Sequence, residues 1–321
     1  MLVITDIAPT QPNCPDTAAL WSRWKPAGIH QRVAERCFRE GRQLYAADDD
    51  GRKMAKEFPV VIWREHTDES QIELASKLAD WLPADTHAVV LVSAASGDFR
   101  GHYDRRWHSG EGNLHVTVLL RETAPHEHVG LAYAILPVLA LCDCAAGLVT
   151  SHRTVKVKWI NDILLDGAKI GGALSRGKTR GSIFTHAVFG MGLNINTIPP
   201  VPRTVFVPSV TCLKPHTKEM AMLDVLKRLL SAFASNHSLL IRKGLSGLVP
   251  RYRAVSDVIG RNVRLYADGP GLNDANVAER RILARGTVEA ITDELQIVID
   301  GKPYGSGRLA YEEDCQAFGL E

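Results

Sequence analysis

The sequence predicts an α+β protein, with a mixed sheet flanked by helices and followed by a small β-barrel. From Phe58 onward, β-rich runs alternate with helical patterns, two of which are long. The tail instead consists of short strands separated by turns such as Asp300-Gly301, with no convincing helical pattern among them. We therefore expect a main domain over residues 58–250 and, over residues 258–315, a barrel with its own small core.

Each element of the main domain follows from a periodicity. Asp68 and Gln71 are expected as the N-cap of a helix and its reciprocal partner three residues on. The apolar run 129–149 is long enough to cross a membrane, but it contains Pro137 and Asp143, so a core-buried helix is the simpler interpretation. The stretch 218–240 repeats apolar residues at helical spacing. Strands are predicted at 59–63, 88–94, 114–120, 155–159, 163–165, 169–174 and 187–195, and in the tail at 263–266, 282–290, 295–300 and 308–311.

The first 57 residues are polar, contain several prolines and include one basic helical stretch at 27–45. A DNA-binding helix-turn-helix needs a second helix after a short turn, whereas an acidic run at 48–50 follows here. We therefore expect an N-terminal extension with a solvated helix and no helix-turn-helix.

The bulk composition is that of an ordinary folded protein. The 321 residues are 45% hydrophobic and 23% charged, and the net charge of +2 gives no overall case for a nucleic-acid or membrane partner. No basic segment precedes an apolar core at the start, so no secretory signal is predicted. The six cysteines form no disulfide framework, and Cys142 and Cys144 are interpreted as buried thiols rather than a metal site. A reducing, cytoplasmic location fits.

Three segments contain the residue types that chemistry requires. The first is a loop between two strands that combines Arg100, Arg105 and Arg106 with Gly101 and Trp107. Arginine's planar fork suits phosphate and carboxylate, and a glycine lets backbone N–H groups approach an anion. A solvated basic turn explains the composition equally well.

The second segment runs from Lys156 to Gly172. Alternating lysines on a strand share one face, and the corner Asn161-Asp162 offers groups for ribose or a magnesium-bound oxygen. Lys169 follows a turn and precedes two glycines, so its ammonium group can lie beside a ligand. The third segment, 190–196, is a strand end rich in glycine and amide side chains.

Together these segments resemble the biotin protein ligases, within a broader family that includes the lipoate ligases. Lys158-Trp159-Ile160-Asn161-Asp162 is similar to that family's Lys-Trp-Pro-Asn-Asp signature. The other matching motifs are Lys169-Ile170-Gly171-Gly172, the segments 190–196 and 210–213, and the end of the adenylate loop at 107–114. The resemblance covers residues 58–312. It implies a class II aminoacyl-tRNA-synthetase-like catalytic domain of the biotin/lipoyl ligase type and an SH3-like C-terminal barrel.

The resemblance also implies an activity. The chain is expected to form biotinyl-5′-AMP from biotin and ATP with Mg²⁺. It would then transfer biotin to a lysine of the biotin carboxyl carrier protein domain of a biotin-dependent carboxylase. A monomer or homodimer without a DNA or membrane partner is expected.

Residue roles carry over from the same resemblance. Lys169 and Arg100 are expected to be catalytic, because they neutralise charge that develops at the α-phosphate. Asn161 and Asp162 are expected at ATP and Mg²⁺, with no protein metal ligand beyond a contact at Asp162. The residues expected to bind biotin or the acyl-adenylate are Ser70, Gln71, Ser96, Gly101, His102, Trp107, Gly172 and Asn194.

The chain departs from the family pattern on the side that binds the acid. Phe99 stands in place of the first loop glycine, His102 in place of a second basic residue and Asp104 in place of the last glycine. Alternatives therefore stay open. They are a lipoate or other acyl–protein ligase on the same scaffold, a bifunctional repressor, and a non-catalytic homologue that binds an acyl group or carrier.

Overall fold

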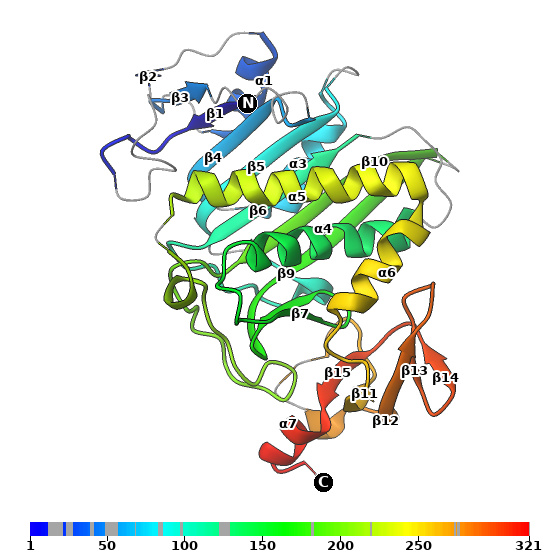
Figure 1. Ribbon diagram of the computed structural model, residues 1–321. Helices are drawn as coiled ribbons and strands as arrows, with labels where there is room; N and C mark the ends of the chain where they lie inside the picture. The colour runs from blue at the N-terminus through cyan, green and yellow to red at the C-terminus, as the bar shows by residue number, and fades with distance from the viewer. Residues whose placement is uncertain are drawn as a thin grey trace.

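The computed structural model describes most of the chain. The described residues are 1–11, 22–23, 28–38, 42–48, 57–67, 69–82, 86–96, 99–121, 129–180, 183–218, 220–272, 274 and 277–320. They form a large sheet covered by helices and a smaller second sheet at the C-terminal end (Figure 1).

The large sheet has ten strands and is mixed. β1 pairs in parallel with β4, and β4 pairs in parallel with β5, whereas the other pairs are antiparallel. The predicted α+β class is therefore confirmed. In spatial order the strands are β2 (Ser22–Arg23), β3 (Tyr45–Asp48), β1 (Leu2–Thr5), β4 (Val60–Thr67), β5 (Ala88–Ser96), β6 (Leu114–Leu120), β10 (Ile183–Leu193), β9 (Ala168–Arg180), β8 (Asp162–Leu165) and β7 (Val155–Lys158).

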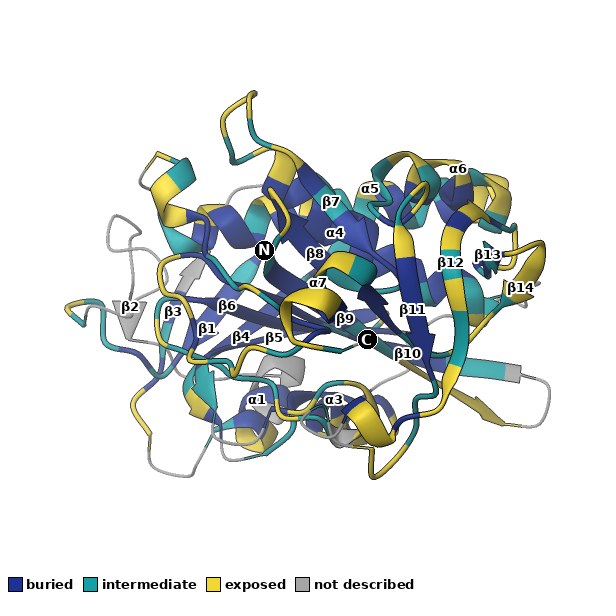
Figure 2. Ribbon diagram, turned by 90° about the horizontal axis from the view of Figure 1, so that it is seen from below, coloured by how far each residue is buried: buried dark blue, intermediate teal, exposed yellow. Residues whose placement is uncertain are grey.

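Helices cover both faces of this sheet, as Figures 1 and 2 show. One face packs against α4 (Val129–Ala146), α5 (Met222–Lys243) and α6 (Leu245–Val255). The central helix, α4, is long and apolar enough to cross a membrane by length and composition, but 67% of it is buried inside the protein. The prediction of a core-buried helix is confirmed, because burial on several sides explains an apolar composition all round.

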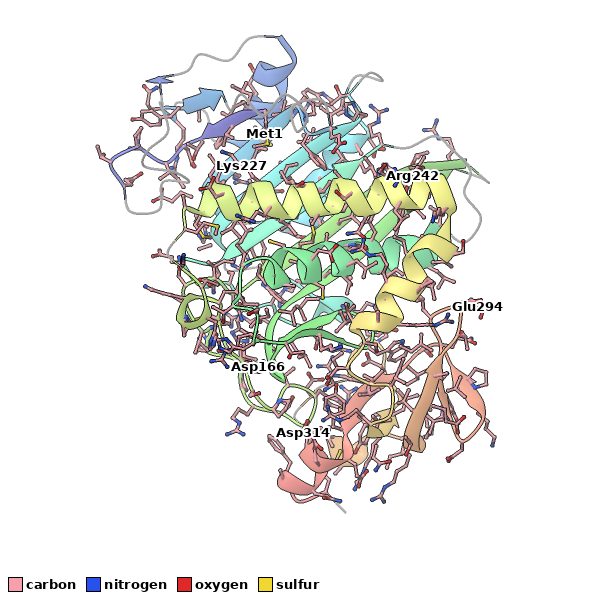
Figure 3. The ribbon with its side chains drawn as sticks, in the orientation of Figure 1. Met1, Asp166, Lys227, Arg242, Glu294 and Asp314 are labelled. Carbon is pink, nitrogen blue, oxygen red and sulfur yellow. The ribbon has the colours of Figure 1, made fainter. Side chains whose placement is uncertain are left out.

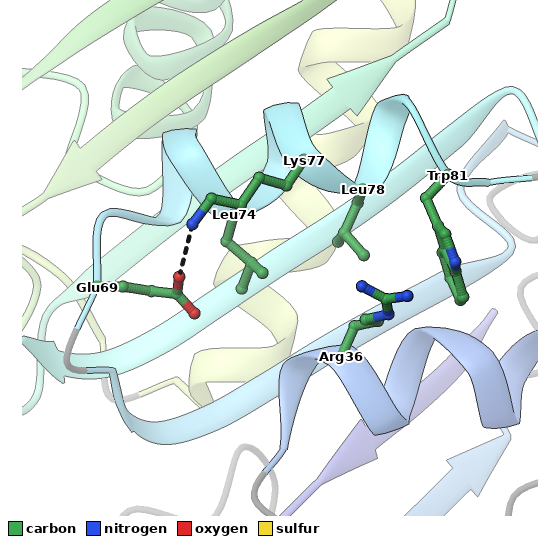
Figure 4. A pocket seen from close by; sticks show the side chains of 6 residues that line it. All are labelled: Arg36, Glu69, Leu74, Lys77, Leu78 and Trp81. Carbon is green, nitrogen blue, oxygen red and sulfur yellow. Dashed lines mark ion pairs between the residues drawn. The ribbon is translucent and has the colours of Figure 1, made fainter.

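The opposite face is covered by α3 (Gln71–Ala79), with α1 (Gly28–Cys37) beside it. Figure 4 shows this contact, where the guanidinium of Arg36 lies 4.6 Å from the Trp81 ring centroid. The Nζ of Lys77 lies 3.7 Å from Glu69 Oε2. The predicted cap is wrong in position. The N-cap is Ser70, whose Oγ accepts from the Glu73 N–H, while Asp68 lies outside the described residues.

The N-terminal segment belongs to the large sheet rather than extending away from it. β1 lies between β3 and β4, and Asp6 Oδ1 accepts a hydrogen bond from the Glu65 N–H at 2.9 Å. The helix expected to be solvated buries Val33, Ala34 and Cys37. Periodicity missed β1 and β3 because each has only four residues.

The second sheet is antiparallel and agrees with the small β domain expected for the tail. Its order is β14 (Lys302–Tyr304), β13 (Ile297–Ile299), β12 (Ile282–Ile291), β11 (Asn262–Tyr266) and β15 (Arg308–Tyr311), followed by α7 (Glu312–Ala317). The predicted turn joins β13 to β14, with φ of 49° at Asp300 and 68° at Gly301. Figure 3 labels Glu294, in the turn before β13, and Asp314, on α7.

The expectation of a separate core for the tail is wrong. Apolar residues of the second sheet, including Val263, Leu295 and Leu309, belong to the same buried cluster as α4 and the large sheet. The indole Nε1 of Trp159 in the main domain also donates to the Leu295 carbonyl at 2.8 Å. The two sheets therefore share one hydrophobic core, and a buried hydrogen bond crosses between them.

A buried ion pair anchors α7 to β11. The Arg264 side chain is only 2% exposed, and its Nη2 lies 2.7 Å from Glu312 Oε1. Arg285 contacts the same carboxylate. The hydrogen bond from Arg264 is the main reason why the pKa of Glu312 falls to about 2.

Glu312→Gln should lower the free energy of unfolding by about 3 kcal/mol at pH 7, because it leaves the Arg264 charge buried without its carboxylate. The contribution of Glu312 should be fully present above its unfolded pKa of 4.5 and be lost as pH falls toward 2. Urea unfolding at pH 7 and pH 3 measures both effects. Glu313→Gln is the control, since Glu313 is 69% exposed and should contribute under about 1 kcal/mol. Equal losses for the two variants would contradict the prediction.

Candidate functional site

A pocket of about 620 Å³ opens between the large sheet and the C-terminal sheet. Its walls come from segments far apart in the sequence: the start of α3, the loop 99–108, β6, the β7–β10 strands and the residues before β15. Eleven of the twelve predicted site residues line it: Ser70, Gln71, Arg100, Gly101, His102, Trp107, Asn161, Asp162, Lys169, Gly172 and Asn194.

Ser96 is the predicted residue that does not line this pocket. It ends β5, and its backbone N–H donates to Ser109 Oγ at 3.0 Å, while the Ser109 hydroxyl donates to the Ser96 carbonyl. Ser96 therefore fastens the loop after Trp107 to β5.

An ion pair lies in the wall formed by β8 and β9. Lys169 Nζ lies 2.6 Å from Asp162 Oδ1, and both side chains are about one-fifth exposed. Burial alone would raise the pKa of Asp162, but the Lys169 ammonium outweighs burial and holds that pKa below its usual range. A β-bulge between Ile163 and Leu164 lies beside the pair in the β8–β9 ladder. Asp162 is therefore a carboxylate at neutral pH, in contact with the Lys169 side chain and with the pocket.

The indole of Trp107 lies close against two glycines of the sheet, Gly172 and Gly192. A Cβ on Gly192 would come within 2.3 Å of the Trp107 ring, and one on Gly172 would come within 3.5 Å. The Lys169 ammonium lies 5.6 Å from the ring centroid. Glycine at position 192 is therefore required by the close approach of the indole.

The same indole is fixed at its polar edge. Trp107 Nε1 donates to His115 Nδ1 at 3.3 Å, and the Phe99 ring lies 5.2 Å from His115. Burial lowers the pKa of His115 to about 4, so this imidazole is neutral and accepts the hydrogen bond at neutral pH. Phe99, which stands where the family has glycine, thus packs against the imidazole that holds the tryptophan.

Polar side chains line one wall of the pocket near the start of α3. Thr117 Oγ1 donates to Gln71 Oε1 at 3.3 Å, and Gln71 Nε2 donates to Ser93 Oγ at 2.8 Å. All three residues are buried. Buried hydroxyl and amide groups with remaining hydrogen-bonding capacity favour a ligand with polar atoms at this end.

The loop 99–107 is folded rather than open. Arg100 and Arg106 form a β-bridge, the Gly101 N–H donates to the Arg105 carbonyl at 2.7 Å, and the Trp107 N–H donates to the Phe99 carbonyl at 2.9 Å. Tyr103 at the tip has a left-handed φ of 54°. Burial and then the nearby Arg105 charge lower the pKa of His102, so it carries little positive charge at neutral pH.

Where this loop meets the C-terminal sheet, charged residues form what we call the arginine–aspartate cluster. Arg105 contacts Asp268, while Arg280 lies 3.2 Å from both Asp268 and Asp274, and Arg308 contacts Asp274. The guanidinium groups of Arg280 and Arg308 also lie over the Phe206 ring. Only Arg105 among them belongs to the loop.

The C-terminal contribution to the pocket was missed from the sequence. Gly305, Ser306, Gly307 and Arg308 line it, as do Asp268 and Asp274. The signal was present in Gly305-Ser306-Gly307-Arg308, which pairs glycines with an arginine just as the loop around Gly101 does.

Lys158 was also missed as a pocket residue, although it belongs to the Lys-Trp-Ile-Asn-Asp motif. It is buried, donates to the Phe206 carbonyl at 2.8 Å and lies 4.7 Å from the Tyr311 ring centroid. Burial lowers its pKa to about 8, against the opposing effect of Asp162 and Asp314. Lys156, its neighbour on the strand, donates instead to the Ala254 carbonyl and does not line the pocket.

The pocket as a whole suits an anion with an uncharged end. Its lining includes six basic residues, Arg100, Arg105, Arg106, Lys158, Lys169 and Arg308, and three acidic ones, Asp162, Asp268 and Asp274. An excess of guanidinium and ammonium groups around glycine-rich backbone is typical of phosphate binding. Within the described ranges, no group of three or more His, Cys, Asp or Glu residues could hold a metal ion.

Comparisons with known proteins agree on one family. Residues 69–194 match the Biotin/lipoate A/B protein ligase family. The chain is 24% identical over 189 residues to the Bifunctional ligase/repressor BirA of Bacillus subtilis, covering 56% of this chain and 57% of that protein. It is 28% identical over 168 residues to Biotin–protein ligase 2 of Arabidopsis thaliana, covering 51% and 49%. The chain thus spans about half the length of these curated relatives.

Solved structures share the fold over a larger part of the chain. A biotin protein ligase from Aquifex aeolicus in complex with biotin and ATP superposes with a TM-score of 0.58. The match covers 78% of this chain and 98% of that chain at 19% sequence identity. At this identity the likeness demonstrates a common fold.

Gly192→Ala should displace the Trp107 indole and lower the free energy of unfolding by about 1–3 kcal/mol, the usual range for overpacking a filled site. The indole resonance of Trp107 in a ¹H–¹⁵N spectrum should shift as its bond to His115 lengthens. Gly130→Ala is the control, since Gly130 also lines the pocket but an added Cβ there meets no atom within 4 Å. An unshifted Trp107 resonance and unchanged stability in Gly192→Ala would show that the indole is not held there.

Proposed function

Because residues 69–194 match the biotin/lipoate A/B protein ligase family, we propose that the chain is an ATP-dependent biotin–protein ligase. It activates biotin as biotinyl-5′-AMP and transfers the biotinyl group to a lysine of a biotin carboxyl carrier protein domain. The observation that carries this proposal is the Lys169–Asp162 pair, which lies beside Trp107 in a pocket whose lining includes six cationic side chains and eight glycines.

In the first step, a carboxylate oxygen of biotin attacks the α-phosphorus of ATP. A carbon–oxygen–phosphorus link forms, the bond between the α- and β-phosphates breaks, and pyrophosphate leaves. Lys169 and Arg100 would neutralise the charge that builds up on the α-phosphate oxygens, which is electrostatic catalysis by preorganised groups. The Asp162 carboxylate supports this role because its contact with Lys169 Nζ at 2.6 Å fixes the direction of the lysine side chain.

In the second step, the amine of the carrier lysine attacks the acyl carbon, an amide forms and AMP leaves. The adenylate is a mixed anhydride, so water must be kept away until the lysine arrives. The loop 99–107, with Arg100 bridged to Arg106, would cover the intermediate.

The pocket offers a magnesium ion few protein ligands, namely Asp162 and Asn161. Magnesium in nucleotide sites takes one or two carboxylates and completes its shell with phosphate oxygens and water. Asp162 and the side-chain oxygen of Asn161, whose amide nitrogen donates to the Ala173 carbonyl, are the groups that would hold it. When bound, the ion would neutralise charge on the nucleotide phosphates.

The polar wall of the pocket favours biotin over lipoate as the acid. Gln71 and Thr117 line the pocket and are held by hydrogen bonds to each other and to Ser93 behind them. Their amide and hydroxyl groups keep further hydrogen-bonding capacity, which the N–H and C=O groups of a ureido ring can use and a dithiolane ring cannot.

We propose the remaining partners on the same basis. The carrier is a biotin carboxyl carrier protein domain, the location is cytoplasmic, and neither DNA nor a membrane takes part. All five cysteines in the described part of the chain are free and buried, and burial raises the pKa of Cys142 and of Cys144 to about 12. Such thiols agree with a reducing compartment.

The proposed function is tested by incubating the full chain with ATP, Mg²⁺ and a carrier domain and weighing the carrier by mass spectrometry. We expect the mass of one biotinyl group with biotin, and at least about tenfold less product with lipoate, because a dithiolane ring forms no hydrogen bonds with the polar wall of the pocket. Lipoylation at the same rate as biotinylation would contradict the proposal that biotin is the preferred acid. No acylation with either acid would overturn the proposal.

Lys169→Ala should lower biotin-dependent exchange of pyrophosphate into ATP by about a hundredfold or more, on the order of 3 kcal/mol, as expected when one preorganised charge is removed. Lys156→Ala is the matched control, since Lys156 is a neighbouring lysine that faces Ala254 rather than the pocket. Pyrophosphate exchange at a near wild-type rate in Lys169→Ala would show that Lys169 does not take part in the first step.

A further inference from the structure

The tip of the loop 99–107 is tied to the C-terminal sheet by one side chain. Arg105 reaches across the pocket mouth, and its Nη2 donates to both carboxylate oxygens of Asp268, 163 residues later in the chain. The Nε of Arg105 also lies 3.9 Å from Asp274 Oδ1. The two ends of the loop are held to the large sheet by Trp107 and Phe99, and the segment between them is closed on itself by short-range backbone hydrogen bonds.

The contact is partly buried, which makes it stronger than a surface ion pair. Asp268 is 8% exposed and Arg105 is 22% exposed. Burial would raise the pKa of Asp268, but its hydrogen bonds from Arg105 and Arg280 hold that pKa below its usual range. Asp268 is therefore a carboxylate at neutral pH, in surroundings where solvent screens the attraction only weakly.

Without this carboxylate, the position of Arg105 would be unfavourable. Arg280 is almost fully buried beside Asp268, and Arg308 adds a further positive charge on the same side of the pocket. In the described part of the chain, the buried Nε atoms of Arg105, Arg280 and Arg308 have no hydrogen-bond partner. Removing the Asp268 charge would leave these three guanidinium groups around the single carboxylate of Asp274, so their mutual repulsion would favour outward movement of Arg105 and its loop.

We propose that Asp268 is a positioning residue, which acts through Arg105 to hold the loop 99–107 closed over the pocket. This inference rests on the proposed function, in which that loop covers the acyl-adenylate. The C-terminal sheet thereby takes part in retaining the intermediate, although Asp268 itself touches no reacting atom. Escape of the adenylate before the carrier lysine arrives should therefore depend on the pair Arg105–Asp268.

The experiment compares Asp268→Asn, Arg105→Met and the double variant with wild type. Asp293→Asn is the matched control, because Asp293 also joins the C-terminal sheet to an arginine of the main domain, Arg253 at 2.8 Å, but lies outside the pocket lining. The readout is the fraction of adenylate released rather than transferred, followed as labelling of an unrelated protein per turnover.

Each single variant should raise this escaped fraction about tenfold or more, as expected for loss of a charge-assisted contact. The double variant should be no more than about twofold worse than the worse single variant, since two residues acting through one contact are not additive. An escaped fraction in Asp268→Asn equal to that of Asp293→Asn would overturn the proposal. Additive effects in the double variant would also overturn it.

A second measurement separates this inference from the proposed function. Tyr103 at the loop tip is exposed, so chymotrypsin cleavage after it reports opening of the loop without any substrate. Cleavage should be about tenfold faster in Asp268→Asn than in Asp293→Asn, while both proteins keep the wild-type thermal midpoint to within a few degrees. Equal cleavage would refute the loop contact even in an active ligase. Faster cleavage in a protein that activates no acid would support the contact and overturn only the function.

Discussion

The indole of Trp107 lies so close to the backbone of Gly192 that a single methyl group would collide with it. This contact sets the geometry of the whole pocket. The indole brings the loop 99–107 down onto the sheet, lies beside Lys169 and donates to the neutral imidazole of His115. Glycine is needed on the sheet side because only bare backbone lets an aromatic face approach so closely. The glycines of β9 and β10 therefore form a flat surface on which the loop rests.

The fold was predictable where a pattern repeats over many residues. The long apolar run became α4, the amphipathic stretch became α5, and the strand at Leu114–Leu120 was predicted to the residue. The misses are short. β1, β3 and β14 have three or four residues each, too few for alternation to stand out, and α6 contains Pro250, which weakens a helical pattern.

The candidate site was also predictable only in part, and the predicted part consists of residues that are close in the sequence. Residues near one another in the sequence, such as Asn161, Asp162 and Lys169, could be grouped because a hairpin places them side by side. Asp268, Asp274 and Arg308 line the same pocket, although they lie about a hundred residues or more after Lys169 in the chain. No local sequence pattern predicts that these residues lie close to Lys169 in the structure. Ser96 illustrates the opposite case, since it was expected in the site from its place in the chain, yet its backbone hydrogen-bonds to the Ser109 hydroxyl and it does not line the pocket.

The core shared between the two sheets restricts how this protein can be divided or recombined. Trp159 belongs to the motif that supplies Asn161 and Asp162, and its indole is held by a carbonyl of the C-terminal sheet at Leu295. A C-terminal sheet taken from a relative would have to reproduce that carbonyl and the packing around it, or the corner at Asn161 would shift. The tail is thus a structural part of the main domain and not an interchangeable module. Chimeras joined in the segment between α6 and β11 are expected to lose the geometry of the pocket before they lose solubility.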